Sequence, residues 1–227
     1  MRKAMVLGVL GLAGTLASPA FADEFSGFRL GMNISSDKLE SDYTSSSAAG
    51  IYTINANRFG YGFNGGWALN KWLAVEGGIN SGTEFTSTPF ARTLAQQQTL
   101  GLASRADFKY GDVTVVGSAW IGSKFAVFGR AGVTGYKVEQ RSTLYDLTDP
   151  REKTINASDK TGSAPIFGVG VQTVLDHALL RLEYKMTEFD DLTFVDHGLP
   201  NVNDDVTVFT LNDSKVSSLT LSIVWVL

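Results

Sequence analysis

The C-terminal residues 216–227, which read VSSLTLSIVWVL, decide the fold class because apolar side chains recur there at every second position. Leu219, Leu221, Ile223 and Trp225 share one face of an extended chain, whereas the positions between them are mostly small. A period of two is typical of a β-strand with two different faces. Such a strand suits a soluble sandwich, with its apolar face inward, or a membrane barrel, with that face toward lipid.

The same alternation recurs upstream and predicts eight strands. They fall within residues 26–35, 57–67, 73–80, 100–120, 125–136, 166–173, 179–185 and 216–227. Long polar connections, at residues 36–56, 81–99, 138–163 and 188–214, alternate with three short turns. Outer-membrane barrels place short turns on the periplasmic side and long loops outside. The pattern therefore predicts an all-β, eight-stranded, antiparallel, up-and-down transmembrane barrel with both termini in the periplasm.

The N-terminus has the features of an export signal. Arg2 and Lys3 precede an apolar run over residues 4–16, and the small-residue triplet at 20–22 precedes an acidic pair. This run is shorter than the roughly 20 apolar residues of a membrane-spanning helix. We therefore expect residues 1–22 to be a cleaved signal peptide and residues 23–227 to form a single barrel domain in the outer membrane of a Gram-negative bacterium.

Charge and cysteine content exclude several classes of function. Without the signal peptide, 17 Lys and Arg face 23 Asp and Glu, so the mature chain is acidic and nucleic acid is not an expected partner. The chain contains no cysteine, which excludes disulfides and thiolate metal sites. We expect no cofactor and no bound metal, and we interpret the acidic residues of 188–214 as solvated.

Charged residues in the middle of the strands lie opposite the apolar face. In a soluble sandwich they would be solvated surface charges, but in a membrane barrel they would point into the lumen. The signal peptide and the alternation of loop lengths favour the second alternative. Because desolvated ions need partners, we predict a lumenal charge network. Its members are Arg29, Glu76, Arg130, Arg181 and Glu183.

The four tryptophans lie near expected short turns or the chain end. Trp67 and Trp72 flank the first turn, Trp120 precedes the second, and Trp225 is close to the C-terminus. Because indole favours the bilayer interface, we expect these residues to form part of a periplasmic-side aromatic girdle. Trp72 departs from this pattern, since it shares its parity with Glu76 rather than with the apolar positions.

The fourth expected strand has an ambiguous face. Arg105, Asp107 and Lys109 share odd parity with the apolar Val113. Either the strand changes face at a bulge near Gly111, or its charged part lies above the membrane.

Several of these segments resemble the OmpA-type transmembrane domain. Residues 163–172 (SAPIFGVGVQ) and 180–184 (LRLEY) resemble its sixth and seventh strands, and residues 128–132 (FGRAG) and 74–78 (AVEGG) resemble others. The resemblance runs through the mature chain in strand order and implies the same eight-stranded barrel. It also implies that acidic and basic side chains pair in the lumen, here Glu76, Arg130, Arg181 and Glu183.

The sequence departs from that family at three points. Gln172 occupies a position where the family often has Glu, and Leu227 replaces the usual aromatic C-terminal residue. No peptidoglycan-binding domain is expected after the last strand, so tethering to the cell wall is not implied.

Eight strands enclose a space that side chains can fill. We therefore expect a non-enzymatic protein with a structural or surface-interaction role, a plugged lumen, and long outer loops available for an external ligand. Expected partners are outer-membrane lipid and lipopolysaccharide, with the barrel-assembly machinery and periplasmic chaperones during insertion. A narrow passive channel is the alternative. A lipid-modifying enzyme is the third possibility. The only histidines available to it as a general base are His177 and His197. We expect no catalytic residue.

Overall fold

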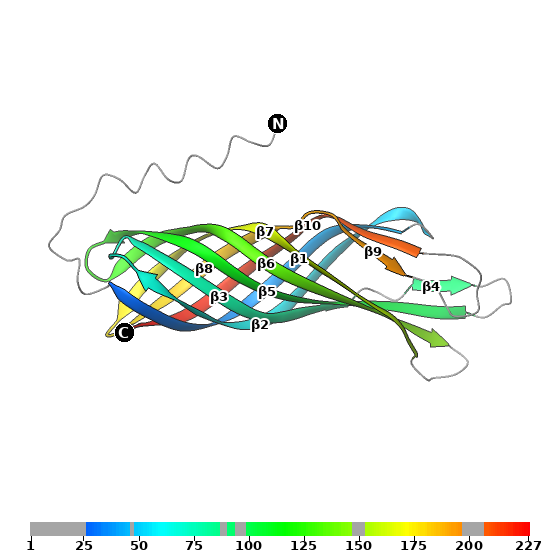
Figure 1. Cartoon of the computed structure of the whole chain (residues 1–227), viewed down its shortest axis with the longest axis horizontal. Coiled ribbons are helices and arrows are strands. Elements are labelled where there is room, and N and C mark those ends of the chain that lie inside the picture. The colour runs from blue at the N-terminus through cyan, green and yellow to red at the C-terminus, as the bar shows by residue number, and fades with distance from the viewer. Residues whose placement is uncertain (1–25, 46–47, 87–89, 94–98, 147–152, 197–206) are drawn as a thin grey trace, which may run out of the picture.

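A computed structural model describes residues 26–45, 48–86, 90–93, 99–146, 153–196 and 207–227 (Figure 1). The predicted signal peptide lies outside these residues. The described strands are β1 (Gly27–Ser45), β2 (Ala48–Ala68), β3 (Leu73–Thr86), β4 (Phe90–Thr93), β5 (Thr99–Ile121), β6 (Phe125–Asp146), β7 (Lys153–Leu175), β8 (Ala178–Glu188), β9 (Leu192–Asp196) and β10 (Thr207–Val226). The described residues include no helix that is long and apolar enough to cross a membrane.

Eight of these strands form a closed barrel, as the sequence predicts. They pair antiparallel in the order β1-β2-β3-β5-β6-β7-β8-β10, and β10 pairs with β1 to complete the cylinder. The short strands β4 and β9 add to β5 and β10, respectively. Closure leaves no unpaired backbone facing lipid, which is the condition for a sheet to cross a bilayer.

Apolar side chains of the membrane-spanning part face outward. Leu221 and Ile223 are 42% and 39% exposed, whereas Arg181 and Glu183 on the paired strand are 1% and 2% exposed. A sandwich would show the opposite arrangement. The outward band of apolar side chains around the barrel, which we call the apolar band, is the surface that contacts lipid.

The three short turns lie at the end of the barrel where the C-terminus is found (Figure 1). In the first turn, the Asn70 side chain accepts hydrogen bonds from the backbone N–H groups of Trp72 and Leu73 at 2.8 and 2.9 Å. In the second and third turns, Gly122 and Asp176 have φ values of 69° and 49°. A tight hairpin requires such left-handed residues, and Gly and Asp adopt them readily.

The predicted boundaries of the long loops are wrong. β1 continues to Ser45 and β2 begins at Ala48, so most of the expected loop 36–56 is a β-hairpin. The expected loops 81–99, 138–163 and 188–214 are likewise partly strand. All of these extensions lie beyond the apolar band, where contact with lipid no longer imposes an apolar outer face.

The polarity of the wall inverts beyond the apolar band. In β1, Lys38 faces outward and the next residue, Leu39, is buried inside. Lys137 and Val138 in β6 repeat this arrangement, as do Lys215 and Val216 in β10. The outer part of the barrel is therefore polar outside and apolar inside, as in a water-soluble barrel. A search for one constant apolar face could not detect these extensions.

The fourth barrel strand, β5, keeps one face over residues 107–120. Its ladder with β6 runs without a register shift through the pairs Lys109–Lys137 and Val113–Val133. Lys109 and Val113 both face outward, so the alternative of a bulge at Gly111 is wrong. The charged part of β5 lies above the apolar band.

The wall divides at two places at the outer edge of the apolar band. The β2–β3 ladder ends at Tyr61–Ser81, and the β7–β8 ladder ends at Ile166–Thr187. Within the described residues, β9, β10, β1 and β2 therefore continue as one sheet, and β3, β4, β5, β6 and β7 as another. The strand ends diverge at the right of Figure 1.

The outward position of Leu221 gives a direct prediction. Leu221→Arg is expected to lower the free energy of unfolding by about 2–4 kcal/mol, because an arginine near the bilayer midplane must face lipid. The measurement is urea unfolding of the barrel refolded into lipid vesicles. Leu69→Arg is the control, since Leu69 is exposed in a short turn and should tolerate charge. Equal, small effects of both substitutions would contradict the lipid-facing orientation.

Candidate functional site: the closed lumen

Glu76 lies at the centre of the charged lumen. It is buried on β3, and Arg181 Nη1 from β8 donates to both of its carboxylate oxygens at 2.9 and 2.8 Å. Arg29 Nη1 and Arg130 Nη2 each donate to Glu76 at 3.4 Å. One carboxylate thus joins β3 to three other strands, β1, β6 and β8. Charge-assisted contacts of this kind are the strong class of hydrogen bond.

A second acid completes the network of the five predicted residues. Arg130 Nε forms an ion pair with Glu183 Oε1. A Cβ atom at Gly168 would lie 2.5 Å from Glu183 Oε1 and 2.9 Å from Arg130 Cγ, so only glycine leaves room for this pair. Arg29, Glu76, Arg130, Arg181 and Glu183 are all buried, and we call this set the ion network.

Gln172 extends the ion network, although it replaces the glutamate of the resembled family. Arg181 Nε donates to Gln172 Oε1 at 2.9 Å, and Gln172 Nε2 donates to Ser118 Oγ at 3.2 Å. The Arg181 guanidinium also lies 5.4 Å from the ring centroid of Phe128. The amide thus orients Arg181 without adding a charge. Sequence reasoning missed Phe128 because its even parity places a large aromatic on the face expected to be polar.

Further polar groups lie between the ion network and the outer part of the lumen. Lys185 is buried on β8, and Tyr110 from β5 donates a long 3.5 Å hydrogen bond to Asp37 on β1. Lys185 and Tyr110 border a cavity of about 10 Å³, together with Thr134 and Ser218. A cavity of this size holds about one water molecule. This cavity has no room for a solute larger than water.

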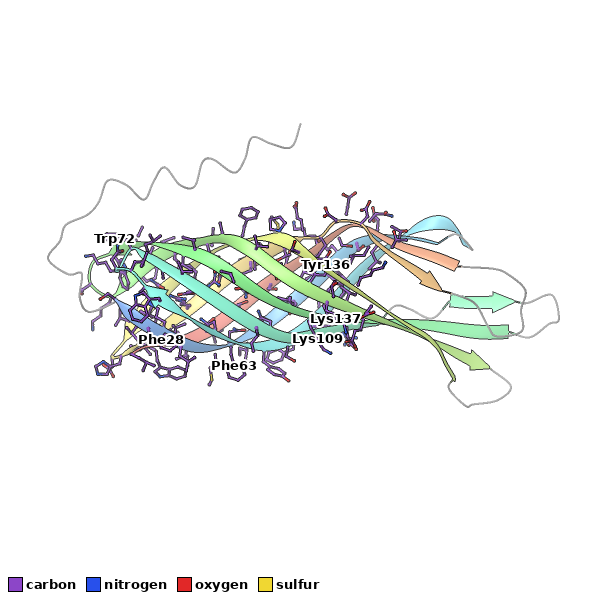
Figure 2. The ribbon with its side chains drawn as sticks, in the orientation of Figure 1. Phe28, Phe63, Trp72, Lys109, Tyr136 and Lys137 are labelled. Atoms are coloured by element: carbon purple, nitrogen blue, oxygen red, sulfur yellow. The ribbon has the colours of Figure 1, made fainter. Side chains whose placement is uncertain are left out.

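An apolar cluster closes the lumen toward the outer end. Its buried members are Leu39, Phe108, Tyr136, Val138, Ala164, Phe189, Leu192, Leu211 and Val216, and we call it the outer apolar cluster. Phe189, which follows β8, packs edge-on against Tyr136 with ring centroids 4.8 Å apart and lies 5.9 Å from Phe108. Figure 2 labels Tyr136 beyond the middle of the barrel, toward its outer end.

The outer apolar cluster joins the two outer sheets. Leu39 and Val216 come from the sheet containing β1 and β10, whereas Phe108 and Tyr136 come from the sheet containing β5 and β6. Because burial of apolar surface is favourable, the cluster holds the sheets together where their backbone ladders have ended. Apolar contacts between the sheets thus take the place of the backbone hydrogen bonds that are missing from the wall.

The four predicted interfacial tryptophans occupy two kinds of position. Trp67 and Trp225 face outward near the short turns, at 57% and 38% exposed. Trp72 lies half-buried in the first turn, and Trp120 Nε1 donates to the Lys71 carbonyl at 2.6 Å. Trp120 has the parity of the lumenal positions. Its hydrogen bond to the Lys71 carbonyl holds the first turn. Figure 2 shows Trp72 and Phe28 at this end of the barrel.

The structure does not bring together those residues considered for catalysis or metal binding that it describes. His177 is exposed in the third short turn, and His197 lies outside the described residues. Asp190 and Asp191 are exposed, while Asp204 and Asp205 also lie outside the described part. Within the described residues, no group of three or more His, Asp or Glu has a geometry that could hold a metal ion.

Comparison with known proteins agrees with this geometry. The outer membrane protein OprG of Pseudomonas aeruginosa is similar in structure at 12% sequence identity and a TM-score of 0.61, covering 89% of this chain and 97% of that chain. The outer membrane protein AlkL in lipid bilayers is similar at 14% identity and a TM-score of 0.53, covering 93% and 94%. At these identities the similarity shows the fold alone.

Sequence comparison identifies the family. No curated protein matches the sequence of this chain. The model of the outer membrane protein beta-barrel domain family matches residues 8–214. The chain therefore belongs to the outer membrane protein beta-barrel domain family, whose members lie in the outer membrane of Gram-negative bacteria.

Proposed function

We propose that the protein is a closed barrel with a structural and surface-interaction role. The carrying observation is that the lumen is filled at two levels, by the ion network around Glu76 and by the outer apolar cluster around Phe189. A water-filled pore would need a continuous polar path. The outer apolar cluster interrupts any such path, because an apolar constriction resists wetting.

The outer sheets supply the surface for contacts. They extend past the apolar band and carry outward charges such as Lys38, Glu40 and Lys137. Strands are more rigid than irregular loops, so these sheets would present a defined face to an external ligand. The location of both termini in the periplasm, cleavage after residue 22, and use of periplasmic chaperones and the barrel-assembly machinery belong to the same proposal.

We also propose a non-catalytic role. Among the described residues, His177 is exposed in a two-residue turn at the same end as the C-terminus, away from the buried charges. The lumenal acids Glu76 and Glu183 are paired with arginines. A general base needs a substrate within hydrogen-bond reach, and the filled lumen around Glu76 and Glu183 offers none.

Planar bilayer recording tests the closed lumen. The refolded protein is expected to give no sustained conductance, because both closures persist in the native state. A wide porin refolded in the same way is the positive control, since barrels of 16–18 strands leave an aqueous channel. Sustained conductance by the wild-type barrel would contradict the proposal and favour the narrow passive channel.

Complementation separates the structural from the surface-interaction role. Cells that lack the protein would be tested for detergent sensitivity and for binding to surfaces. We expect a variant with its β5–β6 hairpin shortened to the edge of the apolar band to restore detergent resistance but not surface binding. If the shortened variant restored both functions, the outer sheets would not be the surface for contacts.

A further inference from the structure

The outer face of β5, β6 and β7 changes character in steps at the edge of the apolar band. Side chains of paired residues form four rows across these strands. From the membrane outward, the rows are Val113, Val133 and Pro165; Gly111, Gly135 and Ser163; Lys109, Lys137 and Thr161; and Asp107, Glu139 and Asp159. We call this surface the graded face. Successive rows lie two residues apart, roughly 7 Å along a strand.

The third row places two cations side by side. Lys109 and Lys137 are directly paired across β5 and β6, and Figure 2 shows them together near the outer end of the barrel. Like charges in this position repel each other. Glu139 Oε1 lies 3.5 Å from Lys109 Nζ and 3.0 Å from Lys137 Nζ, and Asp159 lies 3.2 Å from Lys137 Nζ. Glu139 raises the pKa of Lys137, which stays charged.

The lysines keep capacity for another anion. An ammonium group has three N–H donors, so each lysine can bind an additional oxygen beside its carboxylate partner. The Lys109 side chain is 61% exposed. Surface ion pairs contribute little to stability, so these carboxylates do not exclude a stronger anionic ligand.

The second row is bare, and at Gly135 packing does not require glycine. A Cβ atom at Gly135 would meet only the Gly111 carbonyl oxygen, at 4.0 Å, so a larger residue would fit. Glycine inside a strand costs stability and often marks a place where a ligand approaches the backbone. The Ser163 side chain, also exposed, adds a hydroxyl group beside this bare strip.

We propose that the graded face binds the phosphorylated glucosamine head of lipid A in the outer leaflet. Its acyl chains would lie over Val113 and Val133, its sugar over the bare glycine row, and its phosphate against Lys109 and Lys137. The order of the rows matches the order of groups in that lipid. The acidic row beyond the lysines limits the site on its outer side. This proposal does not depend on the closed lumen.

The test measures binding of two lipids to the intact barrel in nanodiscs. Native mass spectrometry would quantify binding of lipid A that carries both phosphates and of the same lipid after dephosphorylation. We expect the phosphorylated lipid to bind at least tenfold more tightly. K109Q/K137Q should remove about tenfold or more of that affinity, the effect of losing charge-assisted hydrogen bonds. E139Q should leave binding as tight or tighter, because it releases both lysines.

Two matched controls decide between a site and general charge attraction. Lys38 also faces outward at the edge of the apolar band, so K38Q should leave the affinity unchanged. Gly135→Leu should weaken binding by filling the bare row, whereas Gly129→Leu should not. Gly129 is paired with Gly117 near the short turns, and its Cβ position is likewise open.

Three results would overturn the proposal. Equal binding of the dephosphorylated lipid would show that phosphate is not recognised. An equal loss with K38Q would reduce the lysines to general electrostatics. Unchanged affinity of both K109Q/K137Q and Gly135→Leu would show that the lipid binds elsewhere. Folding of each variant is checked independently by its shift in gel mobility on heating.

Discussion

Glu76→Gln is expected to lower the free energy of unfolding by about 3–5 kcal/mol, the cost of removing one partner from a buried ion pair. The carboxylate contacts Arg181 at 2.8 Å and both Arg29 and Arg130 at 3.4 Å. Its loss leaves three buried guanidinium groups with Glu183 as the remaining acid of the ion network. Urea unfolding of the barrel in lipid vesicles measures the change.

Two comparisons isolate the cause of that loss. Glu139→Gln removes a carboxylate from exposed ion pairs and should cost much less than Glu76→Gln. Glu76→Gln combined with Arg181→Gln should cost less than the sum of the single changes, because the two side chains are coupled. Strict additivity, or a loss for Glu76→Gln as small as that for Glu139→Gln, would show that the ion network does not stabilise the barrel.

Phe189→Ala is expected to produce the second large effect, a loss of about 3–5 kcal/mol for a buried aromatic side chain. The ring contacts Tyr136 and Phe108, so its removal leaves a cavity where the two outer sheets meet. Amide hydrogen exchange should increase in the outer parts of β1, β5, β6 and β10. The same exchange measurement should change little in the membrane-spanning parts of these strands.

Phe63→Ala is the matched control for Phe189→Ala. Phe63 faces outward at 55% exposed, so its removal leaves no internal cavity and should cost less. Equal losses for the two variants, or faster exchange spread evenly over the barrel, would contradict the assignment of Phe189 to the contact between the sheets.

The sequence predicted the membrane-spanning part of the fold because lipid imposes a strict rule there. Phe28, Leu30, Met32 and Ile34 must all face outward, and the intervening residues must face the lumen. The five charges of the ion network are recognisable because they lie in the middle of strands, on the face opposite the apolar one. Their pairing follows from the fold, since Glu76 and Arg181 lie 105 residues apart.

The outer part could not be predicted in the same way. In β1 the outward residue is apolar at Leu30 but charged at Lys38, and the apolar Leu39 faces inward. No local signal marks where this change in polarity begins. The outer apolar cluster depends on contacts between residues distant in the sequence, such as Leu39 and Phe108. Phe189 lies outside any strand, so no periodicity could identify it.

The division of the wall shows where the chain can leave backbone groups to solvent. Within the described residues, the ladders of β2 with β3 and of β7 with β8 stop only at the outer edge of the apolar band. Amide groups along the margins of both openings can be hydrated by water, which hydrocarbon could not do. The level at which these two ladders end therefore marks how deeply the wall can be immersed in the membrane. If either gap were longer toward the short turns, unhydrated peptide groups would be exposed to acyl chains.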